Sequence, residues 1–411
     1  MKRLIQYPIL LLIAFSLCLW GCSPDEPAPA GGEESGDSRG YTLDASGSGG
    51  EYSGGGGGSS SGGQGGGQTT EPGQLTAGEW NDLANWDFWK GLYENEDLQA
   101  SEEAWGIQAR DKYEVRVVDN FNRPVVNAIA YLRNKDGETI WTAQSNQEGE
   151  TVLWGKFTEN AQQAEYIEVV YMGSSDIVTD LAAAKLGPVK AEVSTIRTPP
   201  SGLDVYMVVD ATGSMGDEIT YIQSELENVI ERVGNDLSHM DIRLGATFYR
   251  DQEDDYLTRD FDLTLNHSNV ISDVRDQQAD GGGDWPEAVD AGLEVAINGQ
   301  EWNDNAVARV IFLILDAPPH EEDAQAVSNM QRLMQDAAAK GIRVIPVSAS
   351  GIDKKTEFLM RMLALATNGT YTFITDDSGI GGAHIEPTVG EFDVEFLNDL
   401  MVRLVREYAT H

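Results

Sequence analysis

The chain has 411 residues, 41% of them apolar, and a formal net charge of −40 from 68 acidic and 28 basic residues. These values are typical of a globular protein with two or three domains and not of a disordered chain. The charge repels phosphate backbones and anionic lipid headgroups, which argues against nucleic acid as a partner, although solubility in salty water would explain the same acid excess. Cys18 and Cys22 are the two cysteines, so the chain beyond residue 22 has no cysteine pair for an internal disulfide.

The N-terminus has the pattern of a secretory signal. Lys2 and Arg3 precede an apolar run from Leu4 to Trp20. The alternative is an uncleaved membrane helix, but Pro8 interrupts the run and polar sequence follows it at once. Export is therefore the favoured interpretation.

The end of this run, Leu19-Trp20-Gly21-Cys22, resembles a bacterial lipoprotein signal, in which a small residue precedes a cysteine that becomes acylated. Trp20 is bulkier than that pattern usually has. The resemblance implies that residues 1–22 are a signal peptide, that Cys22 is the lipidated (palmitate-bearing) residue, and that the protein is anchored in the bacterial cell envelope. Ser23 is compatible with sorting to the outer membrane; the leaflet is left open.

Two segments follow that differ sharply in composition. Residues 23–74 are rich in Gly, Ser, Pro and acidic residues, and we expect a disordered tether. Residues 75–110 contain many aromatic residues among Asp, Asn and Glu. We expect this Trp-rich collar to be a short helical segment that docks its rings on the next domain; the alternative is an exposed platform for a sugar or a peptide.

Residues 111–198 have the pattern of a small β-sandwich domain. Short β-rich runs are separated by turn sequences such as Asn134-Lys135-Asp136-Gly137 and Asn146-Gln147-Glu148-Gly149. Their spacing predicts seven strands. The stretches 118–128 and 149–154 resemble the transthyretin-like (carboxypeptidase-regulatory-like) domains of bacterial surface proteins. We expect a spacer or docking role for this domain.

From residue 202 to residue 410, short apolar strands alternate with amphipathic helices. This alternation predicts an α/β domain with a doubly wound, mostly parallel sheet and ligands at the carboxyl ends of the strands. The predicted strands are 203–209, 242–248, 310–315, 344–347 and 371–374, and the predicted helices are 219–233, 286–297, 324–340, 354–367 and 393–408.

Oxygen-bearing side chains follow two of these strands. Asp210, Thr212 and Ser214 come directly after the first strand, and Asp316 follows the strand 310–315. One carboxylate and two hydroxyls suit a hard ion such as Mg²⁺ or Mn²⁺. The alternative for this trio is a helix cap, and the next two acids, Asp217 and Glu218, are expected only to favour the positive end of the following helix.

This pattern resembles the von Willebrand factor A family, whose metal-ion-dependent adhesion site opens with Asp-x-Ser/Thr-x-Ser. The resemblance covers residues 202–410 and implies a Mg²⁺ site formed by Asp210, Thr212, Ser214, Asp284 and Asp316. Asp284, after Gly281-Gly282-Gly283, stands where the family usually has Thr. In the family a partner carboxylate completes the coordination, but three carboxylates here would weaken that attraction and would favour a structural ion or a basic ligand group.

Three classes of function follow from this pattern. The first is a non-enzymatic, metal-dependent module for adhesion or protein binding on the cell surface. The second is a metal-assisted hydrolase or phosphatase that uses Asp210, Asp284 and Asp316. Against it, His320 is the nearest candidate base and the sequence shows no partner for it, so we expect a loop residue. The third is a structural envelope protein whose ion only steadies the loops.

Overall fold

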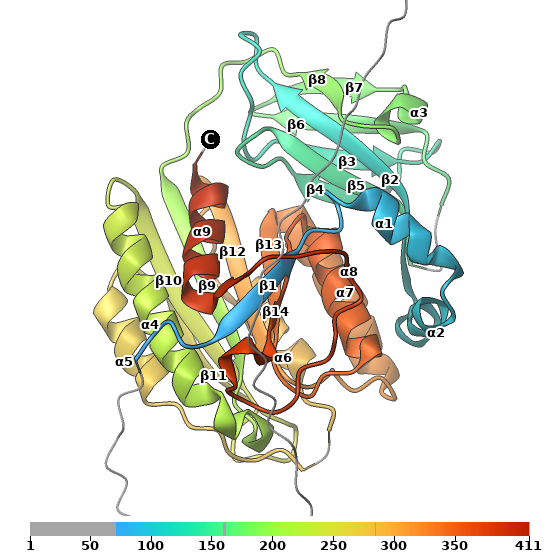
Figure 1. Cartoon of the computed structure of the whole chain (residues 1–411). Coiled ribbons are helices and arrows are strands. Elements are labelled where there is room, and N and C mark those ends of the chain that lie inside the picture. The colour runs from blue at the N-terminus through green and yellow to red at the C-terminus, as the bar shows by residue number, and fades with distance from the viewer. Residues whose placement is uncertain (1–70, 159–161, 284, 411) are drawn as a thin grey trace, which may run out of the picture. The chain divides into compact units, whose positions relative to one another are not determined.

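The computed structural model describes residues 71–158, 162–283 and 285–410. The predicted signal peptide, Cys22 and most of the predicted tether lie outside the described residues, and so does Asp284. Figure 1 shows an α/β domain, formed mainly by the C-terminal half of the chain, and a β-sandwich domain. The prediction of a doubly wound, mostly parallel sheet with a preceding sheet-rich domain is confirmed.

The α/β domain is built on one eight-stranded sheet with the order β11-β10-β9-β12-β13-β14-β1-β15. The five central strands, β10, β9, β12, β13 and β14, are parallel to one another. The other three lie at the edges, β11 at one and β1 with β15 at the other. The strands are β9 (Gly202–Asp210), β10 (Asp241–Tyr249), β11 (Thr258–Thr264), β12 (Ala306–Leu315), β13 (Ile342–Ser348), β14 (Tyr371–Ile374), β1 (Thr76–Trp80) and β15 (Val394–Phe396). β9, β12 and β13 are buried along their whole length, as expected of strands covered on both faces.

Helices cover both faces of this sheet (Figure 1). One face packs against α4 (Ile219–Asp236), α5 (His267–Arg275) and α9 (Leu397–Ala409), and the other against α6 (Val289–Glu294), α7 (Ala324–Lys340) and α8 (Lys354–Thr367). α7 and α8 have the predicted bounds. Each begins after an Asp, Asp323 and Asp353, whose side chain accepts a hydrogen bond from a backbone N–H of the first turn.

Two predicted helices begin later than the apolar pattern indicated. The helix expected from residue 286 begins at Val289, because the backbone N–H of Glu287 donates to the carbonyl of Pro318, and it continues as a short π-helix, Val295–Gly299. The helix expected from residue 393 begins at Leu397, because residues 394–396 form β15. Tertiary hydrogen bonds thus override local propensity at both starts.

The strand β1 comes from the segment that was interpreted as a helical collar. It lies between β14 and β15 and is antiparallel to both. Before it, the buried carboxylate of Glu225 on α4 accepts hydrogen bonds from the backbone N–H groups of Gly73, Gln74 and Leu75 at 2.8–3.2 Å. In the sequence, the β-sandwich domain therefore lies between β1 and the other strands of the sheet to which β1 belongs.

The rest of the collar is helical, as expected, and consists of α1 (Trp86–Gly91), the 3₁₀ turn Leu92–Glu94 and α2 (Glu96–Trp105). Its rings pack on two different neighbours. Trp89 is fully buried and stacks on Phe358 of α8 at 6.2 Å, whereas Trp86 lies 5.5 Å from Trp154 of the strand β5 (Glu150–Thr158). The dense aromatics of this segment thus serve packing.

The β-sandwich domain has seven strands among its described residues, the number that the turn spacing predicted. They form a three-stranded sheet, β5-β2-β8, and a four-stranded sheet, β4-β3-β6-β7, and side chains of both sheets share one core. The strands are β2 (Ile107–Val118), β3 (Ile129–Arg133), β4 (Thr139–Gln144), β5 (Glu150–Thr158), β6 (Tyr166–Tyr171), β7 (Ser174–Val178) and β8 (Val189–Glu192), with a short helix α3 (Leu181–Ala184) between the last two.

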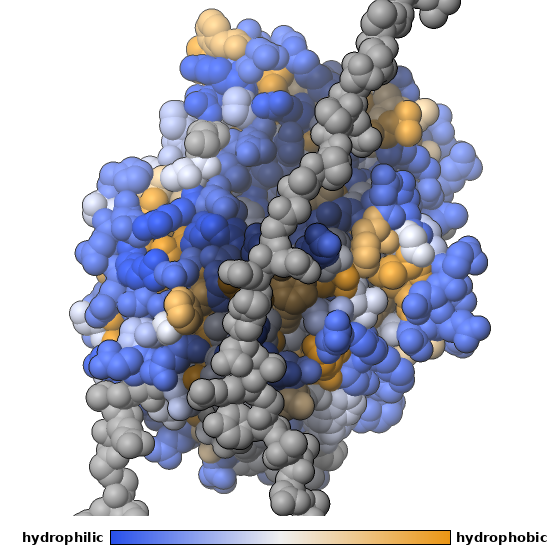
Figure 2. All heavy atoms as spheres, in the orientation of Figure 1, coloured by the Kyte–Doolittle hydropathy of each residue, from blue (hydrophilic) through white to orange (hydrophobic). Residues whose placement is uncertain are grey.

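The surface in Figure 2 is mostly hydrophilic, in line with the large negative charge. Within the part of the chain that the structure describes, no helix has both the length and the apolar character needed to cross a lipid bilayer.

Candidate metal site at the carboxyl ends of the strands

Asp210 and Asp316 lie at the same edge of the sheet. Asp210 is the last residue of β9, and Asp316 follows β12 directly. These two strands are parallel neighbours, with Val209 paired to Ile314, so their carboxyl ends meet. Both side chains are buried. The structure thus brings together two acids that are 106 positions apart in the sequence (316 − 210).

The loop after β9 turns the two hydroxyls toward these acids. Asp210 Oδ1 accepts hydrogen bonds from the backbone N–H of Thr212 at 2.9 Å and from its hydroxyl at 2.7 Å. The Thr212 and Ser214 hydroxyl oxygens are 3.1 Å apart. The Tyr249 hydroxyl, at the end of β10, donates to Asp210 Oδ2 at 3.2 Å. Asp210, Thr212 and Ser214 therefore form one connected oxygen cluster, and Tyr249 is a member that the sequence pattern did not indicate.

The helix-cap alternative for this trio is not what the structure shows. The 3₁₀ turn Gly213–Asp217 begins after Thr212, whose side chain makes no capping hydrogen bond. α4 begins after Glu218, which also makes none. The oxygens of the trio thus contact one another and Tyr249, and they do not cap the turn or the helix that follows.

The glycine loop before α6 packs closely against this cluster. Gly281 and Gly282 both have positive φ angles, +80° and +68°, which other residues rarely adopt. A Cβ on Gly282 would lie 2.9 Å from Glu287 Oε1 and 3.3 Å from Thr212 Cβ. The backbone N–H of Gly282 donates to Asp254 Oδ2 at 2.9 Å. Because these positions are glycine, the loop before α6 can pack closely against Asp254, Glu287 and the Asp210 cluster.

Glu287 is a carboxylate of this site that sequence reasoning missed. Its side chain is 3% exposed, and its Oε2 has no hydrogen-bond partner among the described residues. Burial, together with the charges of Asp210 and Asp251, raises its pKa to about 9. Its position just after the glycine loop and before an apolar helix could have drawn attention to it, as it did for Asp284.

The electrostatics of the cluster are those of carboxylates without a counter-charge. Burial and the neighbouring Asp316 raise the pKa of Asp210 to about 7, and burial raises the pKa of Asp316 to about 6. The Oδ1 atom of Asp316 has no hydrogen-bond partner among the described residues. Within these residues, none of Asp210, Glu287 and Asp316 forms an ion pair with Lys, Arg or His; the ion pairs at this edge join His320 to Asp251 and His384 to Glu218.

These groups fit a hard cation that uses hydroxyls as well as carboxylates. Among the described residues, no three Asp, Glu, His or Cys side chains converge closely enough to hold an ion by themselves. An ion at this edge would therefore need Thr212 and Ser214 in addition to the acids. Buried carboxylate oxygens without partners, next to hydroxyl oxygens, are the donor set that Mg²⁺ or Mn²⁺ prefers.

Two other side chains differ from their predicted roles. His320 has partners after all: its Nε2 is 2.8 Å from Asp251 Oδ1 and its Nδ1 is 2.9 Å from Glu322 Oε1. Burial opposes its charge, but the hydrogen bonds to these two acids raise its pKa above the ordinary value. Glu218 is buried and lies 3.4 Å from His384 Nε2, so it does more than favour the positive end of α4.

Comparisons with known proteins agree with this architecture. Residues 204–382 match the family model of the von Willebrand factor type A domain. The chain is 30% identical over 120 residues to a putative ariadne-like RING finger protein of Acanthamoeba polyphaga mimivirus, and 29% identical over 137 residues to an alpha-protein kinase of Dictyostelium discoideum. These matches cover 29% and 31% of this chain but only 11% and 20% of the two relatives.

A solved structure is also similar. It is an aerotolerance-related membrane protein from Bacteroides fragilis, with 13% identity and a TM-score of 0.30; the match covers 49% of this chain and 96% of that one. The family model covers the strands from β9 to β14 and every described residue of the oxygen cluster. Residues 204–382 of this chain are thus similar to the von Willebrand factor type A domain.

Proposed function

We propose that this domain is a metal-dependent protein-binding module rather than an enzyme, and that Mg²⁺ or Mn²⁺ is held by Asp210, Thr212, Ser214 and Asp316. The observation that carries the proposal is the meeting of buried, unpaired carboxylate oxygens with two hydroxyls at the carboxyl ends of neighbouring strands. Domains of this type generally mediate protein–protein interactions. Glu287 and Asp284 are further candidates for the site, Asp284 on sequence grounds alone.

The partner that suits this edge combines a carboxylate with basic residues around it. A carboxylate would complete the coordination of the ion, as the family resemblance implies. The surrounding loops expose acidic side chains, among them Glu253, Asp255 and Asp280. Basic groups that flank the partner's carboxylate would offset their repulsion and speed the encounter.

The environment of His320 supports binding over hydrolysis. Each of its ring nitrogens lies within hydrogen-bond distance of a carboxylate, Asp251 or Glu322. Both ring nitrogens are thus engaged, and neither is free to accept a proton from a water molecule or a hydroxyl. We therefore assign His320 to the support of the Asp251 loop.

We further propose that the chain acts at the bacterial cell envelope, anchored through a lipid on Cys22, most simply in the outer membrane. The lipoprotein-like pattern at Leu19-Trp20-Gly21-Cys22 supports this anchor. The β-sandwich domain contacts the opposite end of the sheet from the metal site: the Asn127 side chain donates to the carbonyl of Ala306, at the start of β12, at 2.9 Å. It would therefore leave the metal site open to a partner.

A capture experiment tests the proposed function. The full chain is immobilised and exposed to envelope extract in Mg²⁺ or in EDTA, as wild type, as Asp210→Asn and as Asp241→Asn. Asp241 is an exposed acid at the amino end of β10, so it is a control at the far end of the same sheet. We expect a partner that is retained in Mg²⁺ by the wild type and by Asp241→Asn, and lost in EDTA or with Asp210→Asn.

Equal retention under all conditions would remove the metal from the mechanism. If the metal only steadied the loops, EDTA would lower the melting temperature and leave the capture unchanged. Metal-dependent release of phosphate or of a hydrolysed product from the partner would favour the hydrolase alternative.

A further inference from the structure

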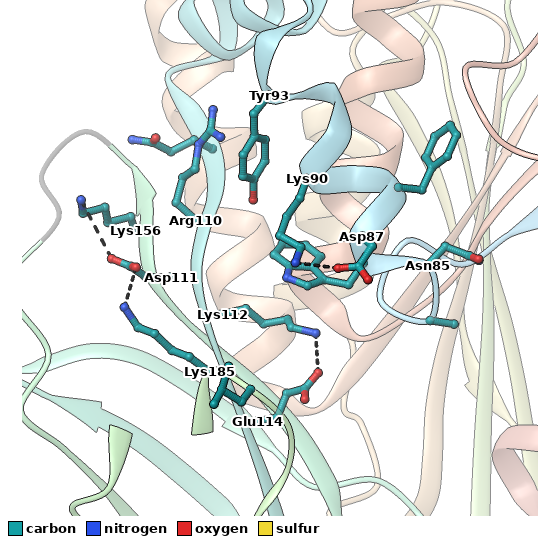
Figure 3. Close-up of a pocket in the computed structure, with 15 residues that line it drawn as sticks. Asn85, Asp87, Lys90, Tyr93, Arg110, Asp111, Lys112, Glu114, Lys156 and Lys185 are labelled. Atoms are coloured by element: carbon teal, nitrogen blue, oxygen red, sulfur yellow. Dashed lines mark hydrogen bonds and ion pairs between the residues drawn. The ribbon is translucent and has the colours of Figure 1, made fainter. Parts of the chain in front are cut away.

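A large open groove lies between the collar and the β-sandwich domain, and it is separate from the metal site. Its volume is about 980 Å³. One wall comes from α1 and the turn after it, the floor from the first half of β2, and the rest from β5 and the segment after α3 (Figure 3). The size and open form of this groove suit a stretch of polymer better than a small enclosed ligand.

The lining of the groove has the opposite charge to the protein as a whole. Five basic and three acidic side chains line it, an excess of two positive charges in a chain with a net charge of −40. The basic residues are Lys90, Arg110, Lys112, Lys156 and Lys185, and the acidic residues are Asp87, Asp111 and Glu114. A local reversal of sign attracts a ligand that the rest of the surface repels.

A bulge in β2 places two of the lysines. Asp111 has a positive φ of 54°, which is uncommon for a residue other than glycine, and the pairing of β2 with β5 shifts its register next to it, between Ile107 and Arg110. The Asp111 carboxylate lies 2.6 Å from Lys185 Nζ and 3.9 Å from Lys156 Nζ. Figure 3 shows both lysines directed toward Asp111. The strained residue thus gathers two amines from different elements at one end of the groove.

Aromatic rings orient two further cations. The Arg110 guanidinium lies 3.6 Å from the centre of the Tyr93 ring and donates to both carboxylate oxygens of Glu102 at 2.8 and 2.9 Å. Lys112 Nζ lies 4.7 Å from the centre of the Trp86 ring. Lys112 is buried and pairs with Glu114. Trp86, Phe88 and Tyr93 are each only partly buried, so the wall also offers apolar ring surface next to the charges.

We infer that this groove binds an acidic glycan, that is, a polysaccharide with carboxylate groups. Its carboxylates would pair with Lys156, Lys185 and Arg110, and its hydroxyls would donate to the acids that line the same groove. Those acids would repel a ligand that carried acceptor groups and no donors. The partly exposed rings offer surface for the apolar faces of sugar rings. An acidic peptide or a nucleic acid meets fewer of these features, and the dense charge of a nucleic acid would also be repelled by the net charge of the whole protein.

The test measures binding by calorimetry with the full chain in EDTA, so that the proposed metal site is not involved. The probe is hexagalacturonic acid, compared with neutral maltohexaose, hexaglutamate and a single-stranded hexanucleotide. The test variant is Lys156→Gln with Lys185→Gln, and the matched control is Lys135→Gln with Lys190→Gln. All four lysines are exposed and lie on the same domain, so both double variants remove two charges without disturbing the core.

We expect hexagalacturonic acid to bind the wild type and the control alike and to bind Lys156→Gln/Lys185→Gln at least about tenfold more weakly, because charge-assisted hydrogen bonds are lost. Binding should weaken as salt is added. The inference is overturned if the acidic hexasaccharide does not bind, if the two double variants bind it equally, or if maltohexaose, hexaglutamate or the hexanucleotide binds as tightly.

Discussion

Two groups of buried acids in the α/β domain differ in what neutralises them. Asp82, just after β1, accepts hydrogen bonds from Arg361 Nε at 2.8 Å, from Arg361 Nη2 at 2.6 Å and from the Trp80 indole at 2.9 Å. Both side chains of this ion pair are 3% exposed. Asp210 and Asp316 are also buried, but among the described residues Asp210 accepts hydrogen bonds from hydroxyl and backbone N–H groups, and one oxygen of Asp316 has no partner.

The surroundings of a buried acid therefore say more about its role than its burial does. Burial alone does not mark a site, because Asp82 is as buried as Asp316. What marks the carboxyl-end cluster is that, among the described residues, no Lys, Arg or His forms an ion pair with Asp210 or Asp316. A metal ion would supply the missing positive charge.

Removal of Arg361 should have the largest effect on stability. Arg361→Met leaves Asp82 buried without its partner, and the loss of one member of a buried pair costs about 3–5 kcal/mol of unfolding free energy. Urea denaturation measures this. Arg332→Met is the matched control, because Arg332 forms partly exposed ion pairs with Glu294 and Asp336, and its loss should cost less than about 1 kcal/mol. Similar losses for the two variants would show that the buried pair is not special.

Asp210→Asn should act in the opposite direction on the metal-free protein. It removes one of the mutually repelling buried charges, so in EDTA the variant should unfold at the same temperature as the wild type or higher. In Mg²⁺ the wild type should gain about 2.7 kcal/mol at a concentration 100 times the dissociation constant, and the variant should gain nothing. Thermal unfolding with and without Mg²⁺ measures both. A variant that is destabilised in EDTA and still responds to Mg²⁺ would contradict the account.

Glu225→Gln should loosen the start of β1. A neutral amide offers one oxygen in place of the carboxylate that accepts from Gly73, Gln74 and Leu75, so we expect a loss of about 1–3 kcal/mol. Hydrogen exchange of the backbone amides at the start of β1 should become faster than elsewhere in the sheet. Glu227→Gln, on the same helix but in a surface ion pair with Arg275, is the control and should leave this exchange unchanged.

The smallest effect concerns pH and His384. Burial opposes its charge, but the nearby carboxylates of Glu218 and Asp376 raise its pKa above the unfolded value of about 6.5. Its contribution to stability should thus be complete below about pH 6.5 and should be lost as pH rises through the higher folded value. Urea denaturation between about pH 5.5 and 8.5, in constant Mg²⁺, measures the unfolding free energy as a function of pH. His384→Gln should lack the part of this pH dependence that comes from His384. An unchanged pH dependence would show that the His384 contacts do not form in solution.

Much of the α/β fold could be predicted from the sequence because its signals are local. Short apolar runs give β9, β12 and β13, and capping Asp residues mark the starts of α7 and α8. The strand β1 could not be predicted, because its five residues have no strand-like alternation and their partners in β14 lie almost 300 positions later. β11 and α5 were also missed, since both are largely exposed at the edge of the domain.

The candidate site also contains both residues that the sequence predicts and residues that it does not. Asp210, Thr212, Ser214 and Asp316 could be predicted because each follows a recognisable strand, and parallel strands bring their ends together. The Asp251–His320 pair depends on how two loops pack against each other, which no local pattern reveals, whereas Glu287 follows the same glycine loop that drew attention to Asp284. The groove was missed for a related reason, because its five cations come from four parts of the chain that only folding brings together.

Direct binding of Mn²⁺ to the full chain tests the central claim, that the carboxyl-end cluster is a cation site. Electron paramagnetic resonance of titrated Mn²⁺ counts the bound ions in the wild type, Asp210→Asn and Asp241→Asn. We expect one site that Mg²⁺ competes for, that Asp241→Asn retains and that Asp210→Asn loses. Absence of bound Mn²⁺ in the wild type, or the same binding by Asp210→Asn, would contradict the account.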